Sequence, residues 1–325
     1  MLLLDAPVRE RLWRRLAEIA EDYIEHVAGG RVSPELSVET IRALLERYDF
    51  RAPQDPLEAL DFAASSLKRF QTHTPHPRYF GLFNPAPATM GIAADFLVAA
   101  FNPQIAAWSH SPFAAEVENH LCRAFGAKFG YPPGETDGVF CSGGAEANHT
   151  AMLAALTSRF PEFAERGVRE LGGQPVLYIS REAHHSFLKA ARLCGLGTGA
   201  VREIPVDNRW AMDTDELQIE ISRDISAGNI PFLVVATAGT TNSGAVDPIA
   251  GIGEIARSAG AWFHVDAAWG GAAMLEPSLR GMLEGTGQAD SITFDAHKWL
   301  SAPMGAGVFL TRHPDILTRT FRVHT

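Results

Sequence analysis

Cysteine and lysine are both scarce in this sequence. Its 325 residues include three cysteines, Cys122, Cys141 and Cys194, and no CxxC pair. An odd number without such a pair indicates neither a disulfide framework nor a zinc site, and it fits a reducing compartment. We therefore expect a cytoplasmic protein that holds no metal. Only four of the 28 basic residues are lysines, so covalent lysine chemistry has few candidates.

Two further absences narrow the class of protein. A formal net charge of -10 argues against a basic surface for nucleic acid or for an anionic membrane. No apolar stretch reaches the roughly 18 residues that a membrane span needs. With 46% hydrophobic residues, the chain has enough apolar side chains for a sizeable core. These features predict a globular protein that binds a small molecule, and neither nucleic acid nor a membrane.

The pattern of apolar residues changes partway along the chain. Residues 5 to about 75 have apolar side chains at helical spacing, which predicts an N-terminal helical segment over 1–75. Beyond residue 116, short apolar runs alternate with helical segments, which predicts a mainly parallel α/β sheet in a domain over 76–325. The seven expected strands are 138–141, 176–180, 200–205, 232–236, 262–265, 292–294 and 307–310.

The residues after the first expected strand suit an anion. Gly143 and Gly144 stand at the start of a helical segment, where backbone N–H groups and the helix dipole favour a phosphate. A Gly-Gly turn is also common between a strand and a helix. The segment is not a Walker loop and lacks the GxGxxG fingerprint. This motif alone therefore leaves both interpretations open.

Polar side chains follow three other expected strands. His184 and His185 suit ring stacking better than a metal, because no further ligand stands at metal-binding spacing. Asp266 is either a helix cap or the partner of a cation. Lys298 has apolar neighbours, which favour a neutral, nucleophilic amine. A phosphate site, a stacking histidine, an aspartate and a lysine together predict pyridoxal 5′-phosphate as the cofactor.

Five segments of the sequence resemble one enzyme family. They read SGGAEANHTAMLAA, EAHHSFLKAA, ATAGTTNSGAVDPI, HVDAAWGGAAM and ADSITFDAHKWLSAPMGAG. From about Pro75 onward the chain is similar to the pyridoxal-phosphate-dependent decarboxylases of the aromatic-amino-acid and glutamate decarboxylase family, also called group II. The resemblance implies the aminotransferase type I fold and the conversion of an L-amino acid to an amine and CO₂. It also implies a homodimer with active sites at the interface, in which the N-terminal helices wrap the partner.

The resemblance implies roles for single residues as well. Lys298 holds the cofactor's aldehyde as a Schiff base, Asp266 pairs with the pyridinium nitrogen, and His184 stacks on the ring. The remaining implied contacts are Thr241 and Ala268 at the ring, and Gly143, Gly144, Ala145 and His297 at the phosphate.

The chain departs from this family at its end. Family members continue through a mobile loop that carries a tyrosine and then through a small C-terminal domain, whereas this sequence stops at Thr325. We therefore expect a fragment or a truncated product that lacks both parts. Two alternatives to a decarboxylase stay open. One is another enzyme of the same fold, such as an aldehyde lyase or an aminotransferase, and the other is a truncated, non-catalytic homologue.

The chain also departs from the family in the expected substrate pocket. Aromatic-amino-acid decarboxylases have Tyr-Phe-Pro where this chain has Leu82, Phe83 and Asn84. Close to Trp108, Ala106 stands where those enzymes have an aromatic residue. We expect these five residues to contact the substrate, but they leave the substrate's side chain open.

Overall fold

The chain divides into two compact units, and the first unit consists mainly of three helices. The computed structural model describes residues 3–81 and 85–323, and its units are Met1–Ala86 and Pro87–Thr325. The first unit contains α1 (Ala6–His26), α2 (Val38–Leu45) and α3 (Pro56–Phe70).

The helices of the first unit begin where the sequence supplies caps. The side chain of Asp5 accepts a hydrogen bond from the backbone N–H of Val8 at the start of α1. Asp55 does the same for α3, and a proline follows each of these caps. Among the described residues of α1, α2 and α3, none is buried. The apolar sides of these helices therefore stay accessible within this unit.

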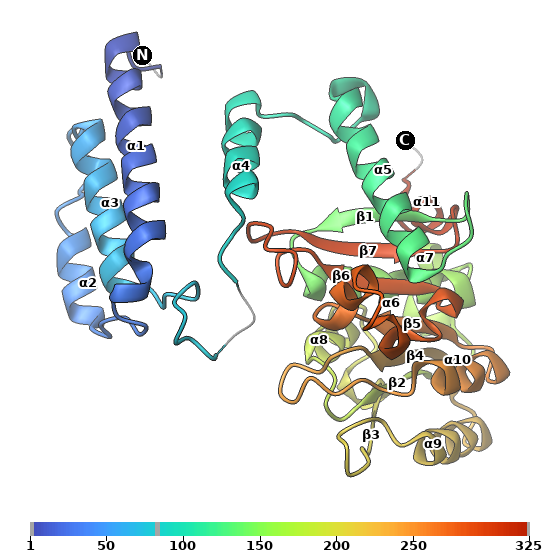
Figure 1. Cartoon of the computed structure of the whole chain (residues 1–325). Coiled ribbons are helices and arrows are strands. Elements are labelled where there is room, and N and C mark those ends of the chain that lie inside the picture. Colours follow the sequence, from blue (N-terminus) through green and yellow to red (C-terminus); the bar gives the residue numbers. More distant parts are fainter. Residues whose placement is uncertain (1–2, 82–84, 324–325) are drawn as a thin grey trace. The chain divides into compact units, whose positions relative to one another are not determined.

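A seven-stranded sheet forms the centre of the second unit (Figure 1). Its spatial order is β1-β7-β6-β5-β4-β2-β3, and every neighbouring pair is parallel except the two pairs that involve β7. The prediction of a mainly parallel seven-stranded sheet is therefore confirmed. The strands are β1 (Asp137–Cys141), β2 (Pro175–Ser180), β3 (Val201–Ile204), β4 (Ile230–Thr237), β5 (Trp262–Asp266), β6 (Ser291–Asp295) and β7 (Gly307–Thr311).

The direction of β7 follows from the link that precedes it. β6 and β7 are joined by residues 296–306, and this segment contains no helix. A parallel neighbour needs a longer crossover, usually with a helix, so the chain turns back and β7 runs antiparallel to β6. β7 then pairs with β1 on its other side, also antiparallel.

Helices cover both faces of this sheet. The helices of the second unit are α4 (Thr89–Phe101), α5 (Pro112–Phe129), α6 (Gly144–Arg159), α7 (Phe163–Arg166), α8 (Ser186–Leu193), α9 (Thr214–Ser226), α10 (Ile249–Ser258) and α11 (Ile316–Phe321). Of these, α5, α6, α8, α9 and α10 pack on the strands, whereas α7 and α11 pack on α6. Short 3₁₀ turns lie at Val27–Gly29, Trp108–His110, Val168–Glu170, Thr198–Ala200, Gly270–Leu275, Arg280–Leu283 and Thr286–Gln288. No helix in the described part of the chain is long and apolar enough to cross a membrane.

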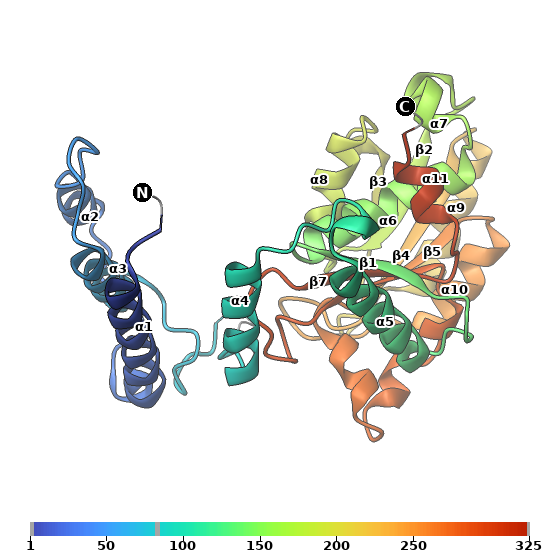
Figure 2. The same cartoon turned by 90° about the horizontal axis from the view of Figure 1, so that it is seen from above.

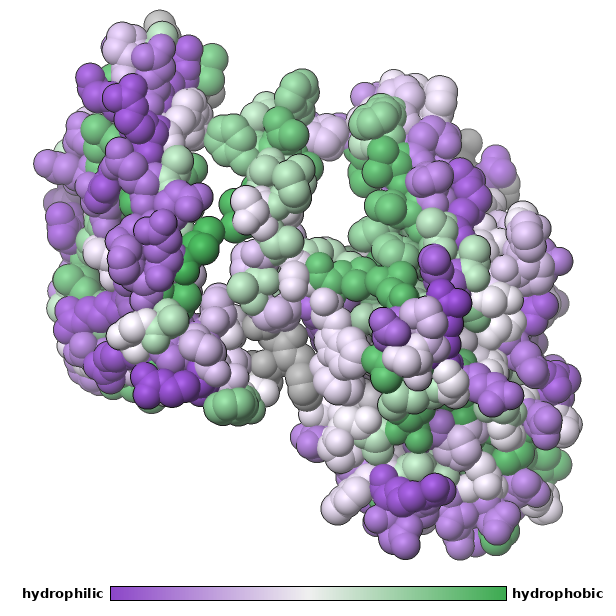
Figure 3. Space-filling model, viewed as in Figure 1, coloured by the Kyte–Doolittle hydropathy of each residue, from purple (hydrophilic) through white to green (hydrophobic). Residues whose placement is uncertain are grey.

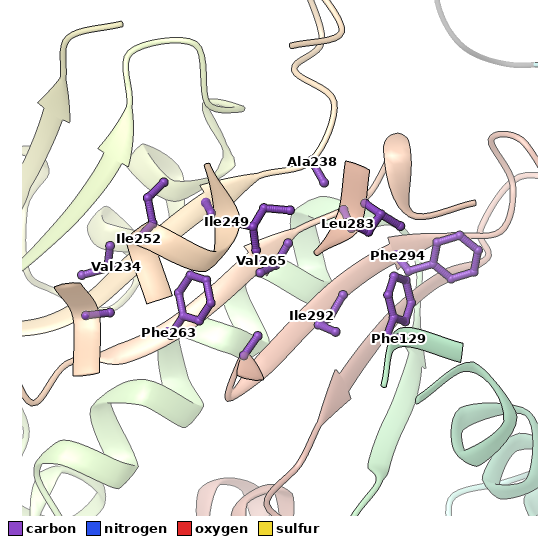
Figure 4. Packing of buried hydrophobic residues seen from close by; sticks show 14 of the residues in the cluster. Phe129, Val234, Ala238, Ile249, Ile252, Phe263, Val265, Leu283, Ile292 and Phe294 are labelled. Carbon is purple, nitrogen blue, oxygen red and sulfur yellow. The ribbon is translucent and has the colours of Figure 1, made fainter. Parts of the chain in front are cut away.

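Alternate side chains of the strands enter two separate cores. Val176 and Tyr178 of β2 belong to a first core that also contains residues of α5, α9 and α10, whereas Leu177 and Ile179 belong to a second core with residues of α6, α8 and α11. Figure 2 shows α8 and α10 on either side of β4, and Figure 4 shows Phe294 packed on the first core. Because both faces are covered, the strands read as continuous apolar runs in the sequence.

The sheet and its helices bring distant segments to one edge. The carboxyl ends of the parallel strands β4, β5 and β6 lie side by side, and they are adjacent to the start of α6, which packs on these strands. In open α/β sheets this edge is where ligands bind. The polar strand-end residues of the sequence therefore meet in space.

Candidate active site

A cavity of about 260 Å³ opens at this edge. Its walls come from the start of α6, from the turn after β2, and from the carboxyl ends of β4, β5 and β6. The lining includes nine residues that the sequence analysis selected, namely Gly143, Gly144, Ala145, His184, Thr241, Asp266, Ala268, His297 and Lys298.

The start of α6 is open toward the cavity. Gly143 is the N-terminal cap residue and supplies no side-chain hydrogen bond, so the first N–H groups of the helix face outward without a capping side chain. A Cβ atom at Gly144 would lie 2.8 Å from Oδ2 of Asp295 and 3.2 Å from the Cβ of Ala268. Only glycine fits at this position without displacing the neighbouring carboxylate. The helix start can therefore receive an anion through its backbone.

Asp266 ends β5 and is held in one orientation. Its side chain is buried, and each carboxylate oxygen accepts one hydrogen bond. Oδ1 accepts from the backbone N–H of Ala268 at 3.1 Å, and Oδ2 accepts from the side-chain amide of Asn148 at 2.8 Å. Because Asp266 also lines the cavity, its carboxylate is fixed and still accessible to a ligand.

A chain of buried hydrogen bonds continues behind Asp266. The Asn148 amide oxygen lies 3.2 Å from Nε2 of His264, and Nδ1 of His264 lies 2.8 Å from Oγ of Ser291. Ser291 accepts a hydrogen bond from the Trp262 indole N–H. Burial lowers the pKa of His264 to about 4. A neutral His264 that donates from Nε2 and accepts at Nδ1 satisfies every member of the chain.

Lys298 lies in the turn after β6, beside a buried carboxylate. Its Nζ is 3.0 Å from Oδ2 of Asp295, the last residue of that strand. The Asp295 side chain is only 2% exposed. Burial raises the pKa of Asp295, and the ammonium of Lys298 opposes that rise. Lys298 is therefore the lysine that lines the cavity, and the carboxylate of Asp295 is the partner of its positive charge.

His184 stands on the side of the cavity contributed by the turn after β2. Its Nδ1 accepts a hydrogen bond from the backbone N–H of Ser186 at 3.3 Å. Burial lowers the pKa of His184, and the charge of Asp266 opposes this effect. A neutral imidazole can stack against a planar ring, as the sequence analysis expects of this residue.

Three buried polar atoms at the cavity have no hydrogen-bond partner within the described residues. They are Oγ1 of Thr237, Oδ1 of Asp295 and Nδ1 of His297. Buried polar atoms in proteins are almost always paired, so three at one cavity indicate a polar ligand. The donor side of the cavity, with His297 and the start of α6, suits an anionic group.

Two of the five expected substrate residues do not line this cavity. Ala106 and Trp108 are exposed and are not among the residues that line it, and the Trp108 indole N–H donates to Glu116 at 3.0 Å. Leu82, Phe83 and Asn84 lie outside the described residues. Their predicted contact with a substrate stays a prediction.

Asn148 and Asp295 are among the cavity residues that the sequence did not point to. Asn148 lies one helical turn into α6 and reaches Asp266, which is far away in the sequence. Asp295 precedes Lys298 by three residues, a spacing that pairs side chains in a tight turn as well as in a helix. The second signal was present in the sequence, whereas the first requires the fold.

Comparison with known proteins agrees with this geometry. Residues 42–325 match the family described as the Pyridoxal-dependent decarboxylase conserved domain. The chain is 30% identical over 323 residues to an aromatic-L-amino-acid decarboxylase of Bacillus atrophaeus. The aligned region covers 99% of this chain and 65% of that protein. It is also 36% identical over 275 residues to a cysteine sulfinic acid decarboxylase of Mus musculus. This aligned region covers 84% of this chain and 55% of that protein.

A solved structure shows the same fold. The Oryza sativa TDC structure with PLP and tryptamine superimposes with a TM-score of 0.92 at 27% identity, and it covers 100% of this chain and 68% of that one. The prediction of the fold is therefore confirmed. The chain spans between about half and two thirds of the length of the curated relatives described above.

Proposed function

The chain belongs to the pyridoxal-dependent decarboxylase family, and from that premise we propose that its cavity binds pyridoxal 5′-phosphate and removes the α-carboxylate of an L-amino acid as CO₂. One observation carries the proposal. Lys298, Asp266 and His184 come from three separate segments, and they line one cavity together with an open helix start. These are the groups that bind the aldehyde, the ring nitrogen, the ring face and the phosphate of this cofactor.

The residues present fit that cofactor. Its phosphate needs several donors, and the start of α6 supplies N–H groups without a capping side chain. Nδ1 of His297 is buried without a partner in the described part of the chain, so a ligand would satisfy it. A side chain at Gly144 would narrow this region, and none is present. The shape and the donors of the cavity therefore agree with a phosphate at the helix start.

Asp266 would control the ring nitrogen. Hydrogen bonds from Ala268 and Asn148 hold both of its oxygens, so the carboxylate keeps one position while a ligand binds. A fixed anion there holds a proton on the ring nitrogen. When bound, pyridoxal phosphate supplies a ring that accepts the electron pair left by the departing carboxylate.

Lys298 and His184 would act on opposite parts of the ligand. The amine of Lys298 would hold the cofactor through its aldehyde carbon, and an incoming amino acid would displace it there. His184 would cover the ring face, and because burial lowers its pKa, its imidazole would place little positive charge beside the ring.

The two relatives suggest the substrate class. Their names, aromatic-L-amino-acid decarboxylase and cysteine sulfinic acid decarboxylase, differ in the substrate's side chain but share the α-carboxylate. We therefore assign an L-amino acid as substrate and leave its side chain to the test below.

We also propose that the protein is a homodimer in the cytoplasm. Met90 and Phe101 on α4 are 78% and 81% exposed, and Phe113 at the start of α5 is 83% exposed. Figure 3 shows the apolar surface over α4 and α5. Apolar residues gathered on one surface favour a protein partner, and a second copy fits the expected dimer. The three cysteines are free, which suits a reducing compartment.

The test uses the purified chain incubated with pyridoxal phosphate. Glutamate, aspartate, 2,4-diaminobutyrate and aromatic amino acids, each labelled in the carboxyl carbon, are offered in turn. We expect labelled CO₂ from at least one of them and no matching keto acid. Keto acid without CO₂ would instead indicate an aminotransferase.

The position of the cofactor is checked separately. Borohydride reduction followed by peptide mapping should label the peptide that contains Lys298. Lys189→Arg, a matched change on α8, should leave the label in place, and Lys298→Arg should remove it. A label on any other lysine contradicts the assignment.

A further inference from the structure

The carboxylate of Asp295 is enclosed directly beneath the amine of Lys298. Oδ2 lies 3.0 Å from Nζ, and the side chain is 2% exposed. Oδ1 is buried with no hydrogen-bond partner in the described part of the chain. Asp295 therefore has one oxygen on the amine and a second oxygen free at the same cavity.

The other charged and titratable groups around Asp295 leave Lys298 as its closest partner. Nε2 of His297 is 3.7 Å from Oδ2. Asp266, from β5, acts on it as a like charge. The Cys141 thiol at the end of β1 is neutral, because burial raises its pKa to about 12. Glu146, in the first turn of α6, is engaged with the backbone and hydroxyl of Ser142.

The buried pair poses a chemical problem for cofactor attachment. Nζ reacts with an aldehyde only as the neutral amine, and the adjacent carboxylate stabilises the ammonium. The proton on Nζ must therefore move before the bond forms. Oδ2 is the acceptor within hydrogen-bond distance, whereas solvent reaches only part of the lysine side chain, which is 25% exposed.

We propose that Asp295 is the acid–base group for cofactor attachment at Lys298. Oδ2 takes one proton from the Lys298 ammonium, and the freed electron pair on Nζ bonds the aldehyde carbon. A second proton passes from nitrogen to the aldehyde oxygen, and the proton held by Asp295 joins it, so that the oxygen leaves as water. Nζ keeps one proton and a positive charge, and Asp295 is again an anion, so atoms and charge balance. The same transfers in reverse release Lys298 when an amine displaces it.

This inference rests on the proposed function, because it assumes that the aldehyde reaches Lys298. It adds a role for a residue that ordinary cofactor contacts do not require. A residue with a purely structural role would change the amount of bound cofactor, whereas an acid–base residue changes how the attachment rate depends on pH.

The test measures the rate of attachment between pH 6.5 and 8.5. Pyridoxal phosphate is mixed with the chain, and the change in cofactor absorbance and the borohydride-trapped label on Lys298 are followed with time. In the unmodified chain we expect a nearly flat profile, because the proton moves within a neutral pair. In Asp295→Asn the amine must lose its proton to solvent, so the rate should rise about tenfold per pH unit. At pH 7 we expect this variant to be at least about tenfold slower.

Two controls separate this role from a loss of structure. Asp290→Asn changes a carboxylate at the opposite end of β6, where it accepts from the backbone of Phe263, and its profile should stay flat. Pyridoxine 5′-phosphate, which has no aldehyde, should bind Asp295→Asn at least as tightly as the unmodified chain, because an anion near the phosphate site has been removed.

The outcomes are distinguishable. Parallel profiles for Asp295→Asn and the unmodified chain overturn the acid–base role of Asp295 and leave the proposed function intact. If Asp295→Asn does not fold, the pH profile of the unmodified chain still tests the proposal. An attachment rate that rises about tenfold per pH unit in the unmodified chain contradicts the acid–base role of Asp295. If no label reaches Lys298 at any pH, the proposed function fails and this inference fails with it.

Discussion

His264 makes the stability of the second unit depend on pH, and replacing it by glutamine isolates the effect. The side chain is fully buried in β5 between Asn148 and Ser291. Burial lowers its pKa from 6.5 to about 4. The unfolded chain therefore binds a proton below pH 6.5 that the folded chain does not bind until about pH 4. The stability from neutral His264 is complete above pH 6.5 and is lost as the pH falls toward 4.

The size of this effect follows from the difference in pKa. Two and a half units correspond to about 3 kcal/mol of unfolding free energy lost between pH 7 and pH 4. Asp247 acts in the opposite direction. It is buried, and burial raises its pKa from 3.8 to about 6, so protonating it favours the folded state. That gain is about 2 kcal/mol over the same range, so the two groups nearly cancel.

The assay is urea unfolding of both proteins at several pH values from 7 to 4. His264→Gln keeps an amide that can donate to Asn148 and accept from Ser291, but it cannot titrate in this range. We expect the free energy of unfolding of the variant to rise by about 3 kcal/mol relative to the unmodified chain as the pH falls. All other titrating groups are common to both proteins and cancel in this difference.

The comparison uses the slope with pH, so a constant loss of stability from imperfect packing of glutamine does not affect it. Parallel curves for the two proteins over the whole range would refute the reasoning. They would show that His264 titrates alike in the folded and unfolded chains and is therefore not held neutral by burial.

Three substitutions at the cavity give further predictions. Asp266→Asn should lower kcat at least about 10²-fold, because the fixed anion at the ring nitrogen is lost, while cofactor titration shows a smaller change in affinity; a variant that keeps most of its rate contradicts this. Gly144→Ala places a methyl group 2.8 Å from Oδ2 of Asp295; we expect cofactor affinity to fall about tenfold by fluorescence titration, and equal affinity would refute the steric argument. Asn148→Leu removes the amide that donates to Asp266 and should lower the free energy of unfolding by about 2 kcal/mol; an unchanged urea midpoint would show that the amide is dispensable.

Much of the fold could be predicted from the sequence because both faces of the sheet are covered. Strands buried on two sides read as short apolar runs, and each of the seven predicted runs overlaps a strand. The direction of β7 was not visible in its own residues. It depends on the short link over 296–306, whose length excludes a helical crossover.

The candidate site could be predicted where single residues stand out from their surroundings. Lys298 is a scarce residue type at a strand end, and Asp266 is a lone carboxylate at the end of an apolar strand. Asn148 could not be found in this way, because its value lies in a contact with Asp266 that only the packing of α6 on the sheet creates. Ala106 and Trp108 were selected by resemblance alone, and the structure does not place them at the cavity.

The order of strands in the sheet has a consequence for biosynthesis. Of the seven strands in this sheet, β1 is the first to leave the ribosome, yet its neighbour in the described sheet is β7, the last of the seven to be made. Until β7 has been made, β1 has no partner strand in this sheet. The apolar side of α5, which packs on both β1 and β7, is then only partly covered. Closing such a long loop is slow and leaves apolar surface open to wrong partners. Nascent chains of this protein should therefore depend on chaperones until β7 has emerged from the ribosome.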